Sequence, residues 1–158
     1  DLDYLIVDMP PGTGDIQLTL SQSSPLTGAV VVTTPQDIAL IDAKKGLKMF
    51  EKVNVPLLGI IENMSVFICP CCGEVTHIFG EGGAKRMSEQ YGVPMLGELP
   101  LSPAIREAAD SGRPTVAAEP ESAAAKMYRA IAMKIAGSIA KLGKDYTARM
   151  PTISVKND

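Results

Sequence analysis

The three cysteines of the chain all lie in one short stretch, Cys69-Pro70-Cys71-Cys72, which is followed by Gly73. Cys69 and Cys72 have the C-x-x-C spacing that lets two thiolates reach one metal centre from a tight turn. One pair cannot complete a four-ligand site, and the sequence has no second pair. A two-fold dimer in which each chain donates both residues is the economical solution. Four thiolates would hold either a 4Fe-4S cluster or a zinc ion, and spacing alone does not choose.

Other interpretations of this stretch stay open. A redox disulfide normally opens a helix at its first cysteine, whereas Gly73 and the β-branched residues after it favour a knuckle-like turn. Cys71 is an extra thiol that is inert, oxidisable or an alternative ligand. His77 could be a ligand, but a turn or hairpin residue is the better interpretation of a lone histidine after the pair.

The apolar run Tyr4–Val7 ends in Asp8 and leads into a loop of proline and glycine. A run this short, bounded by turn residues, predicts a strand buried on both faces. Asp8 would then lie at the carboxyl end of that strand, where open α/β sheets bind their ligands. In P-loop NTPases an acid at this position holds Mg²⁺, usually through water. The alternative is a strand that ends in a surface turn, with Asp8 solvated.

The loop after Asp8 offers further groups to a nucleotide phosphate. Gly12 or Gly14 could present a backbone N–H to the γ-phosphate. Asp15 closes the loop and is equally suited to cap the helix that we expect over 16–21. No G-x-x-x-x-G-K-S/T motif occurs in the chain, so the usual cradle and lysine for the β- and γ-phosphates are absent from this sequence.

Two later strand ends carry candidate contacts for an adenine base. Asn63 follows the apolar run 57–61, and its carboxamide offers a donor and an acceptor that match the N6 and N7 edge of adenine. Pro100 and Leu101 follow the run 94–99 and could pack on the face of the base. A turn asparagine and a plain strand exit are the alternatives at these two places.

Taken together, these motifs are far more specific than any one of them. The loop D-M-P-P-G-T-G-D from Asp8 to Asp15, T-T-P-Q at 33–36, E-N-M at 62–64 and the cysteine pair resemble those of the Mrp/ApbC family of iron–sulfur cluster carrier ATPases. That family belongs to the MinD/ParA-like deviant class of P-loop NTPases. The resemblance runs from the first residue to about residue 142.

This resemblance implies a function and a set of residue roles. The function is that of an ATP hydrolase with ATP and Mg²⁺ as cofactors, whose homodimer holds a labile 4Fe-4S cluster on Cys69 and Cys72 and passes it to apo-proteins. Asp15 would lie close to the attacking water and to the dimer partner, and Asn63 would contact the base, as in the nitrogenase iron protein.

The family's lysine-bearing phosphate loop lies upstream of Asp8, so we expect this chain alone to be inactive as an ATPase. Two alternatives stay open beside the carrier. One is a zinc-bridged dimerisation module without catalysis, and the other is a MinD/ParA-like positioning ATPase.

Strands alternate with helices along the rest of the chain. This predicts an α/β fold with a mostly parallel sheet flanked by helices, incomplete at the N-terminus. We expect a partial P-loop NTPase-like domain over 1–142, with an irregular cysteine knuckle at 64–80, and a flexible tail over 143–158. Besides the elements already described, the pattern predicts a strand at 29–33 and helices at 37–52, 82–91, 103–110 and 122–142.

The composition agrees with an ordinary globular domain, since 46% of the 158 residues are hydrophobic and 21% are charged. The net charge of −3 gives no general attraction to nucleic acid. No apolar run reaches transmembrane length and no signal peptide is visible, so we expect a cytoplasmic protein without a membrane partner. Cysteines confined to one stretch have no distant loops to join, which argues against a disulfide scaffold.

Overall fold

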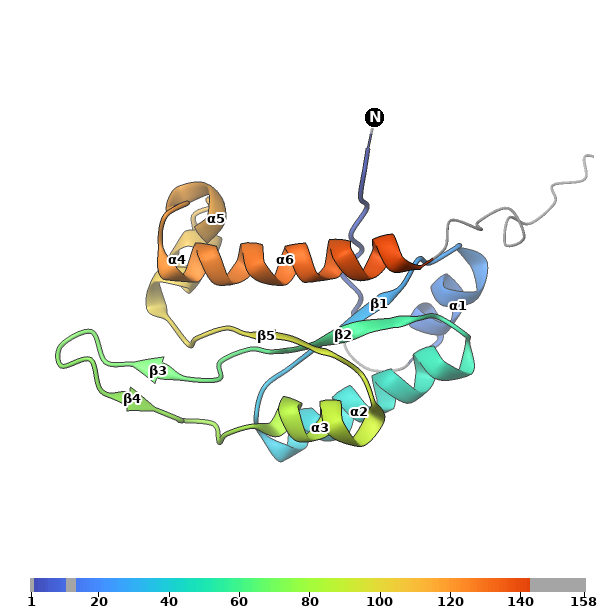
Figure 1. Ribbon diagram of the computed structural model, residues 1–158, viewed down its shortest axis with the longest axis horizontal. Helices are drawn as coiled ribbons and strands as arrows, with labels where there is room; N and C mark the ends of the chain where they lie inside the picture. The colour runs from blue at the N-terminus through green and yellow to red at the C-terminus, as the bar shows by residue number, and fades with distance from the viewer. Residues whose placement is uncertain (1, 11–13, 143–158) are drawn as a thin grey trace, which may run out of the picture.

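The structure is a computed structural model that describes residues 2–10 and 14–142. Parallel strands form its central sheet, in the order β1-β2-β5: β1 (Ala29–Thr33), β2 (Leu57–Glu62) and β5 (Met95–Glu98). Helices lie on both faces of this sheet (Figure 1): α2 (Asp37–Lys52) and α3 (Gly83–Tyr91) on one face, and α6 (Ala123–Lys141) on the other. The parallel sheet flanked by helices that the sequence predicts is confirmed.

The central strand β2 is buried on both faces because consecutive side chains point to opposite sides of a sheet. Ile60 is fully buried on the face of α2 and α3, in one core cluster with Leu47. Ile61 points the other way and packs with Leu96 and with Ile131 of α6. Burying each such aliphatic side chain stabilises the fold by about 1.5–3 kcal/mol. Two apolar layers therefore hold the strands in place.

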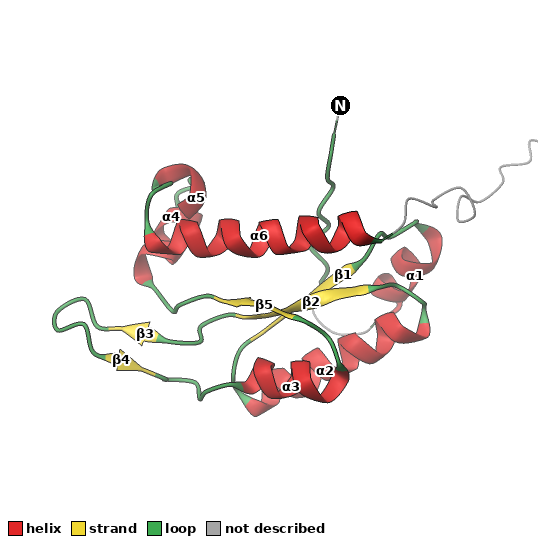
Figure 2. Cartoon of the chain, viewed as in Figure 1, coloured by secondary structure: helices red, strands yellow, loops and turns green. Residues whose placement is uncertain are grey.

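A β-hairpin follows β2 and extends beyond the sheet (Figure 2). Its strands β3 (Phe67–Ile68) and β4 (Val75–Thr76) pair antiparallel, with Ile68 opposite Val75. The prediction of an irregular segment over 64–80 is therefore wrong at the positions of these two strands. Strands of 2 residues each are too short to leave a periodic signal in the sequence.

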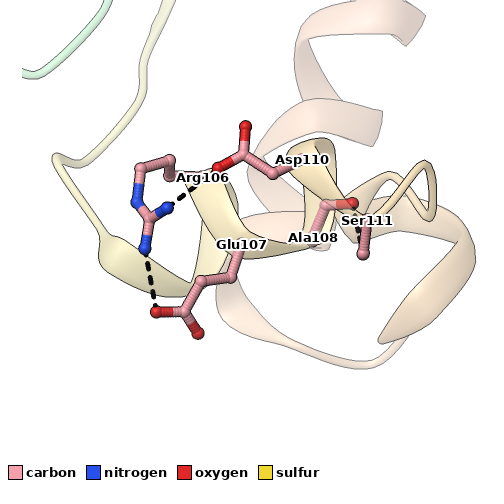
Figure 3. Close-up of polar contacts among 5 residues, drawn as sticks. All are labelled: Arg106, Glu107, Ala108, Asp110 and Ser111. Atoms are coloured by element: carbon pink, nitrogen blue, oxygen red, sulfur yellow. Dashed lines mark hydrogen bonds and ion pairs between the residues drawn. The ribbon is translucent and has the colours of Figure 1, made fainter.

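The remaining described helices are α1 (Asp15–Ser23), α4 (Pro103–Asp110) and α5 (Thr115–Ala118). The surface of α4 carries polar contacts (Figure 3): Arg106 Nη1 donates to Asp110 Oδ2 at 2.8 Å, and Arg106 Nη2 donates to Glu107 Oε1 at 3.1 Å. Ser111 Oγ donates to the Ala108 carbonyl at 2.9 Å. The charged side chains are about two-thirds exposed, so each pair contributes only about 0–1 kcal/mol.

The strand predicted over Tyr4–Val7 is wrong. Residues 2–10 form neither helix nor strand, and the side chains of Leu5 and Ile6 are 78% and 90% exposed. The segment runs away from the sheet toward the N-terminus (Figure 1). A strand needs a neighbour to accept its backbone hydrogen bonds, and no strand of the described sheet pairs with this segment. The apolar run shows that these side chains suit a buried position, but it does not specify which neighbouring element would cover them.

The outer edge of β1 is likewise unpaired within the described residues, since β1 lies at one end of the sheet. Val32 of this strand is 58% exposed. An open groove of about 420 Å³ follows the edge of β1 and α2 and reaches Asn63.

Within residues 2–10 and 14–142, no helix combines the length and the apolar character that crossing a bilayer requires. The longest, α6, carries the cations Lys126, Arg129, Lys134 and Lys141.

Candidate functional site

The chain continues from β2 and β5 as two adjacent segments beyond the carboxyl ends of these strands. The Leu99 N–H donates to the Glu62 carbonyl at 2.8 Å, and the Ser65 N–H donates to the Leu99 carbonyl at 3.0 Å. These bonds place side by side the two segments that carry Asn63, Pro100 and Leu101, the residues that the sequence predicts to contact adenine. This carboxyl edge of the sheet is where parallel α/β proteins bind their ligands.

Asn63 makes a local turn contact in the structure. Its side-chain Oδ1 accepts a hydrogen bond from the Met64 N–H at 2.9 Å, and its own N–H donates to the Thr33 carbonyl at 2.7 Å. Met64 has a φ of 56°, which is uncommon outside glycine and marks a sharp turn. A carboxamide oxygen has two lone pairs, so this contact leaves capacity for a second donor. Contact with a base stays a prediction.

The acids on either side of the predicted phosphate loop, Asp8 and Asp15, lie outside the strands of the sheet. Asp8 is exposed within residues 2–10, and not at the end of a buried strand as predicted. Asp15 is the first residue of α1 and Gly14 is its N-cap, with no side-chain capping bond, so the predicted cap by Asp15 is wrong. Figure 1 shows α1 at the opposite end of the sheet from the hairpin. Gly12 lies outside the described residues.

The cysteines occupy the turn of the β3–β4 hairpin. The Cys69 N–H donates to the Glu74 carbonyl at 2.9 Å, and the Gly73 N–H donates to the Cys69 carbonyl at 2.9 Å. Gly73 has a φ of 75°, a left-handed conformation that costs glycine no strain. A turn therefore carries the pair, which is the geometry that the sequence favoured over the helical start of a redox disulfide.

The thiols at this turn are free and accessible: Cys71 and Cys72 are exposed and Cys69 is half-buried. Hydrogen bonds from the backbone N–H of Cys72, and then of Cys71, lower the pKa of the Cys69 thiol below its usual value. The thiolate is the form that binds metals. Within the described ranges, no three His, Cys, Asp or Glu side chains are arranged to share a metal ion. The turn thus presents an accessible pair of free thiols.

Alkylation of Cys69 is expected to have its pH midpoint at a lower value in the folded protein than in urea. The reason is that the N–H groups of Cys71 and Cys72 stabilise the Cys69 thiolate only when the turn is formed. The rate of iodoacetamide labelling at each cysteine can be followed from pH 6 to pH 10 by peptide mass spectrometry, with Cys71 as the internal control. Identical midpoints for Cys69 in the two states would show that the turn does not favour the thiolate.

Sequence reasoning missed the polar contacts at the base of the hairpin. Ser65 is 3% exposed, and its Oγ donates to the Leu99 carbonyl at 3.2 Å. His77 Nδ1 lies 3.1 Å from the Ser65 carbonyl oxygen, so this histidine joins the two arms of the hairpin at their base. Glu62 was missed as well. Its signal was an acid directly after the apolar run 57–61, where a buried polar group requires a partner.

The fold and the strand-end site together define a class of protein. The nucleotide-binding protein from Archaeoglobus fulgidus, solved in complex with ADP, has a TM-score of 0.65 and 41% identity over 77% of this chain and 49% of its own. The cell division ATPase MinD of Pyrococcus furiosus has a TM-score of 0.56 and 30% identity over 70% of this chain and 43% of its own. The fold is that of a MinD-like P-loop NTPase.

A family comparison narrows this class. The model described as NUBPL iron-transfer P-loop NTPase matches residues 1–136, and the chain belongs to that family. The iron-sulfur cluster carrier protein of Escherichia coli K12 is 61% identical over 139 residues, which are 88% of this chain and 38% of that protein. The family resemblance predicted from the motifs is confirmed. The chain spans less than half the length of these relatives.

Proposed function

We propose that the chain acts in an ATP-dependent iron–sulfur cluster carrier that holds a 4Fe-4S cluster as cargo and passes it to apo-proteins. The observation that carries the proposal is the exposed hairpin turn, on which Cys69 and Cys72 stand and where backbone N–H groups lower the pKa of Cys69. Thiolates are the protein ligands of such clusters, and N–H groups directed at sulfur are among the features that tune them. An exposed position also suits a cargo that must leave.

A homodimer follows from the ligand count, because each copy supplies Cys69 and Cys72 and the cluster takes four thiolates. The flanks of the turn support contact with a second hairpin. Ile68 and Val75 lie opposite each other and are 51% and 56% exposed. Burial of these apolar side chains between two copies would favour association beside the thiols.

ATP with Mg²⁺ is the nucleotide that family membership favours at the carboxyl edge of the sheet. The carboxamide of Asn63 suits the polar edge of adenine, and Pro100 and Leu101 suit its face. In the loop, Asp8 would hold Mg²⁺ through water and Gly12 or Gly14 would donate an N–H to the γ-phosphate. Asp15 would position the attacking water. These loop roles require Asp8 and Asp15 to lie beside Asn63, whereas the structure has Asp8 in an exposed segment and Asp15 at the start of α1.

Anaerobic reconstitution with ferrous iron and sulfide tests the cargo. A shared 4Fe-4S cluster predicts a brown protein with visible charge-transfer absorbance and about two iron and two sulfide per chain. A zinc-bridged module instead predicts a colourless protein with about half a zinc per chain. Failure to acquire colour, with zinc bound at that ratio, would replace the carrier with the dimerisation module.

We expect this chain alone to release phosphate from ATP no faster than a buffer blank. The reason is that it contains no G-x-x-x-x-G-K-S/T motif to hold the β- and γ-phosphates. A colorimetric phosphate assay with Mg²⁺ measures this, and Asp8→Asn serves as the matched variant. Turnover above the blank that Asp8→Asn abolishes would show that the chain builds a phosphate site in another way.

A further inference from the structure

Glu62 is a buried charged residue for which the proposed chemistry has no role. It is the last residue of β2, directly before Asn63, and it is 2% exposed. Removing a carboxylate from water costs several kcal/mol unless hydrogen bonds compensate. A carboxylate in the core therefore requires a hydrogen-bond donor that offsets this cost.

The partner of Glu62 is the first turn of α3. Its Oε2 accepts a hydrogen bond from the Ala84 N–H at 2.6 Å, and this bond is buried. The helix has no side-chain cap of its own, since Gly82 is the N-cap and its first turn holds no acidic residue. A carboxylate at this place satisfies a free N–H and complements the positive end of the helix dipole. Glu62 thus caps α3 from a neighbouring strand.

The start of α3 also contacts the segment that follows β1. Gly83 is buried, and a Cβ at this position would lie 2.9 Å from the Pro35 carbonyl oxygen and 2.8 Å from Leu40 Cδ1. Thr33, at the end of β1, is the register partner of Glu62. The ends of β1 and β2 and the start of α3 therefore meet at one point.

The cysteine hairpin is the part of the chain between the two ends of this contact. The hydrogen bond joins residues 22 positions apart and closes a loop that has Cys69 and Cys72 near its tip. The first arm is held to the sheet by the Ser65 N–H, which donates to the Leu99 carbonyl at 3.0 Å. The return arm reaches the sheet at Ala84, whose N–H donates to the Glu62 carboxylate.

We propose that Glu62 is a positioning residue for the cysteine pair, because it holds the return arm of the hairpin against the sheet edge that carries Asn63. The inference rests on the proposed function, in which a nucleotide binds beside Asn63 and Cys69 and Cys72 hold the cargo. A displacement of Asn63 reaches the hairpin through the adjacent Glu62 and the start of α3. Glu62 itself touches neither nucleotide nor cargo.

Hydrogen exchange of the whole chain tests this role with Glu62→Ala, Glu62→Gln and the control Glu98→Ala. Glu98 is the register partner of Glu62 on β5, but it is exposed. Loss of the Glu62 carboxylate is expected to speed exchange of the Gly80 and Ala84 amides roughly tenfold. The Ile60 amide, which bonds the Pro94 carbonyl in the sheet, keeps its rate. Glutamine retains an acceptor oxygen and restores most of the protection.

A cobalt(II) titration supplies the functional readout. Glu62→Ala is expected to weaken binding about fivefold, by the thiolate–cobalt absorbance, with the alkylation midpoint of Cys69 unchanged. Exchange that rises only at Ala84, or equally at Ile60 and Gly80, would overturn the inference, because Glu62 would then be a helix cap or a general core residue. If the unaltered chain binds no cobalt, the proposed function fails, and the exchange pattern still decides whether Glu62 holds the hairpin.

Discussion

Cys69→Ala and Cys72→Ala are each expected to reduce iron and sulfide incorporation more than tenfold on anaerobic reconstitution. Each substitution removes one thiolate from each copy, so a shared site falls from four ligands to two and cannot hold the cluster. Visible absorbance and iron and sulfide assays on protein of equal concentration measure the effect.

Cys71→Ala is the matched control, since it removes an exposed thiol from the same turn. It is expected to keep at least half of the incorporated iron. If Cys71→Ala lost as much as Cys69→Ala, the ligand pair would be misassigned. If none of the three variants lost iron, the turn would not be the cargo site.

Gly59→Ala is expected to destabilise the fold by about 3 kcal/mol. Gly59 lies in the middle of β2, and a Cβ there would lie 2.7 Å from the Pro94 carbonyl oxygen and would also collide with Leu96 Cγ. Its φ of 157° is one that other residues rarely adopt. Backbone on the neighbouring strand cannot move aside without breaking the β2–β5 pairing. Urea unfolding followed by far-ultraviolet circular dichroism measures the loss.

Gly46→Ala is the control for this substitution. Gly46 lies inside α2, and a Cβ at this position meets nothing within 4 Å. Alanine there is expected to stabilise the protein by about 0.5–1 kcal/mol, because it favours the helix and restricts the unfolded chain. Equal urea midpoints for Gly59→Ala and the unaltered chain would show that β2 and β5 do not pack as closely as described.

The sequence predicts those elements whose signal is local and repeated. β-branched residues indicate β1 at 29–33, and helical spacing indicates α2 at 37–52 with bounds that match the structure. The helix predicted at 122–142 is found as Ala123–Lys141, capped by Ser122, whose Oγ accepts from the Ala125 N–H at 3.1 Å. Such patterns depend on the residues of the element itself, so they can be interpreted without knowledge of its neighbours.

The features that the sequence does not predict depend on neighbours distant in the chain. Tyr4–Val7 has the composition of a buried strand but no strand beside it within the described residues. Glu62 looks like an acid at the surface end of a strand, and only the start of α3 makes it a buried cap. The candidate site divides in the same way. The segments that carry Asn63 and Pro100–Leu101 run side by side beyond two neighbouring strands, whereas Asp8 is exposed and does not end a strand.

The central claim is that two copies of the chain share one cluster through Cys69 and Cys72. Native mass spectrometry of the anaerobically reconstituted protein tests it most directly, because it counts chains and metal in the same particle. The account predicts two chains with one 4Fe-4S cluster, which separate into single chains when the cluster is removed by a chelator. Single chains that each carry a complete metal centre, or single chains with a Cys69–Cys72 disulfide and no iron, would contradict it.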